Sequence, residues 1–221
     1  MDHSQLWNKL KEYLSPERIK AFDCVLSNRT RHFTVAVENL FQSHNASAVM
    51  RNCDCFGIQD LHVIANANSY KLSKDVAMGA QKWVDMHHYH QNQNNTQDCI
   101  DALKLSGFQI VATCPHMQDT LLPDFDIRKK SAFFFGTERD GLSSTVLEQA
   151  DSFVRIPMYG FSESYNISVS AALVLHDVIT RLKKSKVDWG MSQQEILEKK
   201  IDWAVKSIRS GPQLLKQFHV V

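Results

Sequence analysis

The sequence predicts an α/β fold, with a parallel sheet covered by helices on both faces. Short and nearly continuous apolar runs alternate along the chain with segments whose apolar residues repeat at helical spacing. Apolar strands joined by helices are typical of parallel sheets, because such sheets are buried on both faces. With 221 residues and 43% hydrophobic content the chain can bury a sizeable core, so we expect one domain with short appendages.

The first predicted elements are a helix at residues 16–27 and a strand at 33–37. Ser15 can cap the helix, Pro16 suits its first turn, and apolar residues then recur at helical spacing. The strand that follows is a short apolar run.

A second helix is expected from Asn45 to Phe56, where Gly57 ends it. The same alternation then continues along the chain. We expect further strands at 61–64, 108–113, 132–135 and 153–156, and further helices at 96–105, 143–149, from 168 onward and at 192–208. The last helix is interpreted as an extension beyond the sheet.

The net charge of +1 hides an uneven distribution of charge. Residues 1–32 carry six Lys and Arg against four Asp and Glu, residues 33–180 carry ten against sixteen, and residues 181–221 carry nine against four. The basic ends can face a polyanion if the fold brings them together, or they can form an ordinary solvated surface. The candidate cations are Arg18, Lys20, Arg29 and Arg31 near the start and Arg181, Lys183, Lys184 and Lys186 near the end.

The amino terminus lacks the apolar core of a signal peptide, and charges interrupt every apolar run, so we expect a cytoplasmic protein. An odd number of cysteines, five, without a C-x-x-C pair favours reduced thiols. His87, His88 and His90 have no partners at ligand spacing, so we expect no metal site.

The chain also lacks a glycine-rich phosphate loop. It has no G-x-G-x-x-G after its first strand and no G-x-x-x-x-G-K, which argues against an ordinary dinucleotide site, a P-loop and the common methyltransferase fold. Polar clusters instead follow three separate strands.

The first cluster lies at 43–58, where Asn45 can cap a helix that carries Arg51. Because its neighbours are apolar, we expect the Arg51 guanidinium to be half-buried and to need an anionic partner, either a ligand or a structural ion pair.

The second cluster lies at 133–143, where Glu138 follows an apolar strand and is either a ligand contact or part of a capped turn. The third cluster, Ser164, Asn166 and Ser168, precedes an apolar helix. These short side chains can cap that helix, and its free N–H groups can hold a polar ligand.

In their order and placement these clusters resemble the motifs of the SpoU/TrmH branch of the SPOUT RNA methyltransferases. The matching segments are N-A-S-A-V-M-R-N-C-D-C-F-G-I, G-T-E-R-D-G-L-S and I-P-M-Y-G-F-S-E-S-Y-N-I-S-V-S-A-A-L. The stretch A-M-G-A-Q-K-W-V at 77–84 is also similar to the family segment between the first two motifs.

The resemblance implies a SPOUT (α/β knot) fold with a deep carboxyl-terminal trefoil knot, and a homodimer. It divides the chain into a basic helical extension at 1–32, a methyltransferase domain at 33–184 and a helical extension at 185–221. It further implies that S-adenosylmethionine binds three loops, at 113–116, 135–141 and 156–166.

Site residues follow from the same resemblance, residue by residue. The implied catalytic residues are Arg51, Asn45, Glu138, Ser164 and Asn166. The implied cofactor-binding residues are Thr113, Gly136, Thr137, Glu138, Gly141, Ile156, Met158, Ser164, Asn166 and Ser168. The expected RNA-binding residues are Arg18, Lys20, Arg29, Arg31 and Arg51.

The implied reaction is methyl transfer to a ribose 2′-hydroxyl of RNA. Because the chain is short and has flanking helices, it is most similar to the family members that act on guanosine 18 in the D-loop of tRNA. Two alternatives remain at this stage: an enzyme acting on ribosomal RNA, and a non-catalytic RNA-binding protein of the same fold. DNA lacks the 2′-hydroxyl and is not an expected substrate.

Overall fold

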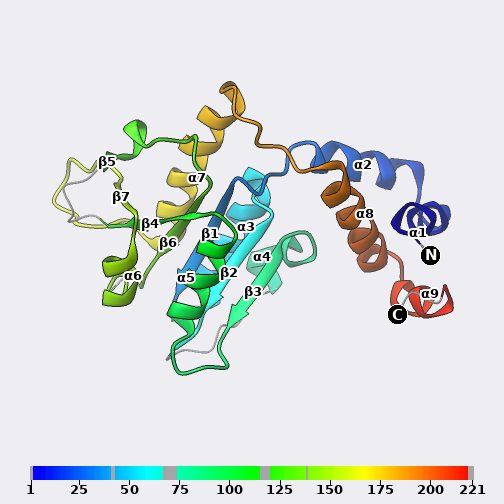
Figure 1. Cartoon of the computed structure of the whole chain (residues 1–221), viewed down its shortest axis with the longest axis horizontal. Coiled ribbons are helices and arrows are strands. Elements are labelled where there is room, and N and C mark those ends of the chain that lie inside the picture. The colour runs from blue at the N-terminus through cyan, green and yellow to red at the C-terminus, as the bar shows by residue number, and fades with distance from the viewer. Residues whose placement is uncertain (1, 41–42, 67–73, 115–119, 138, 219–221) are drawn as a thin grey trace. The chain divides into compact units, whose positions relative to one another are not determined.

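A computed structural model describes residues 2–40, 43–66, 74–114, 120–137 and 139–218 (Figure 1). The chain divides into two compact units. One comprises Arg31–Trp189, and the other joins Met1–Thr30 to Gly190–Val221. The predicted terminal extensions therefore form one unit together.

The larger unit contains a parallel sheet, which confirms the predicted fold class. Among the described residues the sheet has seven strands in the order β3-β2-β1-β6-β4-β7-β5, and each neighbouring pair is parallel. The strands are β1 (Phe33–Glu38), β2 (Asp60–Ile64), β3 (Asp85–Tyr89), β4 (Gln109–Thr113), β5 (Thr120–Leu121), β6 (Ser131–Phe135) and β7 (Ser152–Arg155).

Helices cover both faces of this sheet, as predicted (Figure 1). On one face α3 (Ser43–Phe56) and α7 (Ile167–Lys184) pack on the strands, and on the other face α5 (Asn95–Leu105) and α6 (Ser144–Gln149) do. Successive strand residues alternate between the two layers: Val35 lies in the α3 and α7 layer and Ala36 in the α5 and α6 layer. A short helix, α4 (Lys74–Ala77), packs against α3.

The terminal unit is helical. Its helices are α1 (His3–Leu10), α2 (Pro16–Leu26), α8 (Gln193–Ser207) and α9 (Gly211–Gln217). Trp203 is buried at its centre and meets Phe22 edge to face, with ring centroids 5.5 Å apart. The predicted cap of α2 is in place, because Ser15 accepts a hydrogen bond from the Arg18 N–H. Helix α8 is capped in the same way by Ser192, which accepts from the Glu195 N–H.

The structure differs from the predictions in several details. Strand β3 was not predicted, because its D-M-H-H-Y sequence is polar and lies at the sheet edge. Helix α3 begins at Ser43, so Asn45 lies in its first turn and the prediction that Asn45 starts it is wrong. The trefoil knot stays a prediction.

A histidine cluster lies on β2 and β3. The rings of His62 and His87 stack with centroids 4.6 Å apart, and His62 Nδ1 lies 3.1 Å from the Tyr89 hydroxyl. His87 Nε2 lies 2.8 Å from Asp60 Oδ1. Burial would raise the pKa of Asp60, but the hydrogen bond from His87 and the charge of Arg31 lower it. Burial, with a smaller effect of His87, lowers the pKa of His62 from 6.5 to about 4.

This shift predicts loss of stability in mild acid. The unfolded protein takes up a proton on His62 near pH 6.5, whereas the folded protein does so only near pH 4. Proton uptake therefore favours the unfolded state between these pH values, so the free energy of unfolding is unaffected by His62 above pH 6.5 and falls as the pH drops towards 4. We expect His62→Phe to reduce the loss in free energy of unfolding between pH 7.5 and 4.5 by about 2 kcal/mol. Urea unfolding at the two pH values measures this. An equal pH dependence in His62→Phe and in the unaltered protein would contradict this explanation.

Candidate active site

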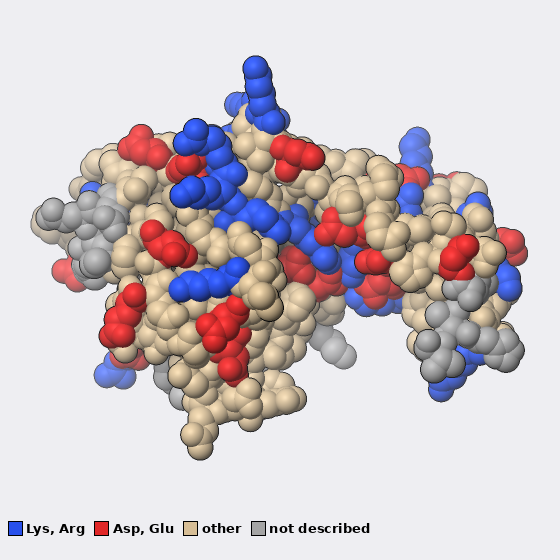
Figure 2. Space-filling model, in the orientation of Figure 1, with Lys and Arg blue, Asp and Glu red and all other residues tan. Residues whose placement is uncertain are grey.

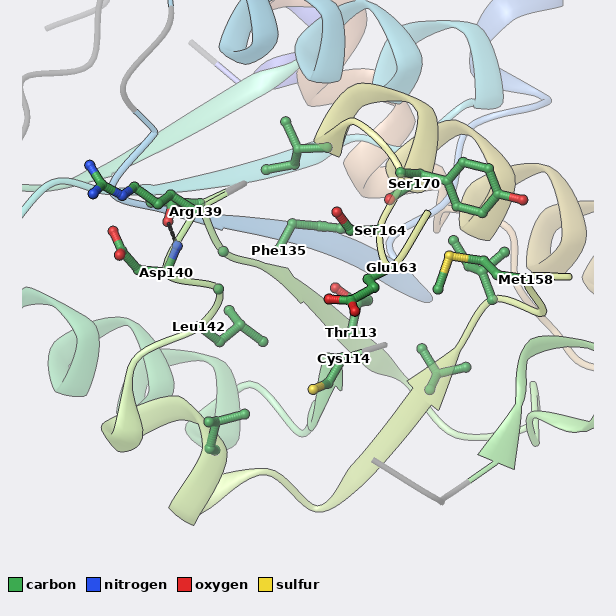
Figure 3. Close-up of a pocket in the computed structure, with 18 residues that line it drawn as sticks. Thr113, Cys114, Phe135, Arg139, Asp140, Leu142, Met158, Glu163, Ser164 and Ser170 are labelled. Carbon is green, nitrogen blue, oxygen red and sulfur yellow. Dashed lines mark hydrogen bonds between the residues drawn. The ribbon is translucent and has the colours of Figure 1, made fainter. Parts of the chain in front are cut away.

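A cavity of about 450 Å³ opens at the carboxyl ends of β4, β6 and β7 (Figure 3). Its walls come from the segments after these three strands, which lie far apart in sequence. Thr113 and Cys114 follow β4, Gly136 and Thr137 follow β6, and Ile156 follows β7. This volume falls in the range of roughly 300–1,000 Å³ that is usual for small-molecule sites.

The loop after β6 is built by a close approach of backbone to backbone. Thr137 and Gly141 exchange two hydrogen bonds, with N···O distances of 3.0 and 3.1 Å. A Cβ at Gly136 would lie 2.1 Å from the backbone C and O of Gly141, so only glycine fits there. Gly141 has a φ of 70°, in the left-handed region that glycine adopts without strain. The loop shape therefore depends on both glycines.

The segment after β7 brings polar side chains to the cavity. Ser164 and Glu163 both line it, and Figure 3 shows the Glu163 side chain beside Thr113. Glu163 was missed in the sequence analysis, although it lies inside the third motif. Met158 and Ile156 add apolar wall on the same side.

Asn166 joins the third motif to the first. It is the N-cap of α7, and its Oδ1 accepts hydrogen bonds from the Ser168 N–H at 2.9 Å and the Ser168 hydroxyl at 2.6 Å. Its Nδ2 donates to Asn45 Oδ1 at 3.2 Å, across 121 residues of sequence. Asn52 Nδ2 also donates to the Ser168 carbonyl at 2.7 Å. The start of α7 is therefore bonded to α3 at two points.

Arg51 lies on α3 beside these contacts, but its side chain is exposed. The prediction of a half-buried guanidinium is wrong, because Met50 and Cys53 turn towards the core while position 51 faces outward. Within the described part of the chain, Arg51 makes no ion pair.

Most of the predicted cofactor-binding residues meet at the cavity. Those that line it are Thr113, Gly136, Thr137, Gly141, Ile156, Met158 and Ser164. Asn166 and Ser168 do not line it and instead form the cap of α7. Glu138, predicted both as a catalytic and as a cofactor residue, lies outside the described residues, as do residues 115 and 116 of the first loop.

The predicted RNA-binding residues divide into two groups. Arg18 and Lys20 are exposed on α2. Arg29 is 1% exposed, with its guanidinium 5.5 Å from the centre of the Trp203 ring, and Arg31 pairs with Asp60 at 3.2 Å and Asp85 at 2.9 Å. For Arg29 the prediction is wrong, because its side chain is buried. Arg31 is part-exposed and its charge is paired within the protein, so its contact with RNA stays a prediction.

The lining suits a partly apolar organic molecule better than a metal. Phe135, Leu142 and Met158 give the cavity apolar walls, while Thr113, Ser164 and backbone groups give it hydrogen-bonding partners. Within the described part of the chain, no group of three or more His, Cys, Asp or Glu residues could hold a metal ion. In that same part, no helix is long and apolar enough to cross a membrane.

Comparison with known proteins agrees with this geometry. The model of the SpoU rRNA Methylase family matches residues 32–176. The tRNA (guanosine(18)-2′-O)-methyltransferase of Borreliella burgdorferi is 40% identical over 186 residues, which cover 84% of each chain. The TrmH/SpoU tRNA modifying enzyme of A. aeolicus superposes with a TM-score of 0.76 at 29% identity, covering 87% of this chain and 97% of the other.

A more distant structure shares the fold alone. The SpoU methyltransferase AviRb from Streptomyces viridochromogenes, in complex with the cofactor AdoMet, superposes with a TM-score of 0.62 at 20% identity. The match covers 77% of this chain and 66% of the other.

The close approach at Gly136 predicts that Gly136→Ala destroys the cavity. The added Cβ meets backbone atoms that cannot rotate away, so we expect a loss of about 3 kcal/mol or more in the free energy of unfolding, or a rearranged loop. Urea unfolding and amide NMR spectra measure both effects. Gly160→Ala, where an added Cβ meets nothing within 4 Å, is the matched control, and an equal loss there would contradict the explanation.

Proposed function

This chain belongs to the SpoU rRNA methylase family, and from that premise we propose that it transfers a methyl group from S-adenosylmethionine to a ribose 2′-hydroxyl of tRNA. The target we propose is guanosine 18, as in the name of the relative that is 40% identical over 84% of the chain. The observation that carries the proposal is the cavity at the strand ends. Residues of the second and third motifs line this cavity, and a hydrogen bond from Asn166 to Asn45 joins the third motif to the first.

The cavity residues fit this cofactor. S-adenosylmethionine supplies an electrophilic methyl group on a sulfonium. The adenine and methionine parts of such a molecule need apolar walls with a few hydrogen-bonding groups, which Leu142, Met158, Thr113 and the backbone of the loops provide. The carboxylate of Glu163 adds negative charge to the lining, which favours a cationic ligand.

The protein mainly has to orient the ribose hydroxyl and assist loss of its proton. We assign orientation to the bonded pair Asn45 and Asn166 and to Ser164, which lines the cavity beside them. The role proposed for Glu138 rests on the family resemblance.

Arg51 is proposed to bind the phosphate next to the target ribose and to stabilise the developing alkoxide. A guanidinium with a pKa above about 12 is a poor base, so the proton passes to the phosphate or to water. The exposure of Arg51 supports a role towards RNA, since a bidentate fork on an exposed helix face can meet a phosphate directly.

RNA affinity beyond the site is assigned to exposed cations. Arg18 and Lys20 lie on α2, and Lys183 and Lys184 lie in the last turn of α7. Figure 2 shows Lys and Arg gathered over the end of α7, with acidic residues around them. Cations placed in this way contact phosphates without reading sequence.

We also propose a homodimer in the cytoplasm. Val169 and Leu173 are exposed on successive turns of α7, and Tyr159 and Phe161 are exposed in the loop before it. An apolar group of this kind favours burial against a second copy of the chain. Sedimentation of the full chain separates a dimer from a monomer.

The first test is transfer of labelled methyl from S-adenosylmethionine to an unmodified tRNA transcript. We expect labelling of the tRNA and none of a copy in which guanosine 18 is replaced. A ribosomal RNA fragment is the comparison substrate. Labelling of that fragment alone would show that the substrate is ribosomal RNA. No labelling of any RNA would favour a non-catalytic RNA-binding protein.

A second test concerns Arg51. Arg51→Lys keeps the charge but loses the planar fork, so we expect kcat to fall by about tenfold or more with little change in cofactor affinity. Single-turnover methylation and calorimetric titration measure the two quantities. Near-full turnover in this variant would show that bidentate phosphate binding is not its role. Lys20→Arg is the control, because it exchanges one cation for another at an exposed position on α2. We expect it to leave kcat unchanged.

A further inference from the structure

We infer that Glu38 is a positioning residue that holds the cofactor loop after β6 in place. The inference rests on the function proposed above. Glu38 is the last residue of β1, it does not line the cavity, and no sequence motif singled it out. Its side chain is 2% exposed.

Three donors converge on this buried carboxylate. The Ser143 backbone N–H donates to Oε2 at 2.9 Å, the Ser143 hydroxyl donates to Oε1 at 2.8 Å, and the Thr96 hydroxyl donates to Oε1 at 2.6 Å. All three are N–H or O–H groups, so the site suits an acceptor-only carboxylate. An apolar residue would be cheaper to bury, which favours a role in placement over one in stability alone.

Ser143 is the point where this carboxylate acts on the cavity. The loop that contributes Gly136, Thr137 and Leu142 to the cavity is fixed at one end by β6 and at the other end by Ser143, which caps α6. Thr137 and Gly141 are joined by two backbone hydrogen bonds. A shift of Ser143 is therefore expected to move both of these residues together. Glu38 therefore sets where the loop lies relative to β1.

The same network reaches the segment that leads into the first motif. The Thr96 hydroxyl accepts from Asn66 Nδ2 at 2.8 Å, and the Asn66 N–H donates to Asn39 Oδ1 at 2.8 Å. Asn39 has a φ of 54°, a left-handed conformation that an asparagine tolerates when its side chain is bonded. The chain turns at Asn39 towards α3, which carries Arg51. The network thus reaches from the start of α6 to the turn at Asn39, where β1 ends.

The test compares Glu38→Gln with Thr34→Val. Glutamine keeps the size of the side chain but offers one acceptor oxygen to three donors. Thr34→Val is the matched control, because Thr34 lies near the other end of β1, is fully buried, and loses one hydrogen bond, from its hydroxyl to the Asp60 carbonyl at 2.7 Å. The measurements are the Kd for S-adenosylmethionine by calorimetry, Tm, and hydrogen exchange of backbone amides in 139–147.

For Glu38→Gln we expect about tenfold weaker cofactor binding and faster exchange confined to 139–147, whereas Thr34→Val lowers Tm and leaves both unchanged. Thr96→Val, which removes one of the three donors, should give a smaller change in the same direction. Equal cofactor affinity and exchange in Glu38→Gln and Thr34→Val would overturn the inference. If the unaltered protein does not bind S-adenosylmethionine, the proposed function fails, and the exchange measurement still decides the role of Glu38.

Discussion

Hydrogen bonding of β6 between β1 and β4, with all three strands parallel, is the constraint on which the rest of the structure depends. Parallel strands end at the same edge of a sheet, so Glu38, Thr113 and Gly136 come together although the chain separates them widely. A direct bond reinforces this edge, from the Thr113 hydroxyl to the Phe134 carbonyl at 2.7 Å. The aromatic residues of β6 are buried on both faces, which holds the strand between the two helical layers.

Above this edge the site is made largely from backbone and from short polar side chains. The loop after β6 has no phosphate-binding glycine motif. Its glycines are needed because the backbone at Gly136 lies too close to the backbone of Gly141 for a Cβ atom to fit. Asn45, Asn52, Asn166 and Ser168 join the two helices that carry the first and third motifs. Arg51 is exposed on α3 next to this junction, where the proposed function has it bind the RNA phosphate.

The predictions that succeeded concern features whose cause is local. Apolar runs became the central strands, and Ser15 and Gly57 limit their helices as expected. Strand β3 was not predicted because an edge strand with one solvent-exposed face does not need a continuous apolar sequence. Arg51 was expected to be half-buried from its apolar neighbours in sequence, but on a helix adjacent residues point about 100° apart, so buried neighbours do not bury it.

By itself the sequence determined the fold class, the order of the main elements and, through its three motifs, the family and the loops that form the cavity. Only the tertiary structure decided that Asn45 bonds Asn166, that Glu38 holds Ser143, and that Arg29 and Arg31 are occupied within the protein. Propensity, capping and periodicity act over a few residues, and a sequence displays them directly. Contacts between residues a hundred positions apart depend on strand order and register, which local patterns do not encode.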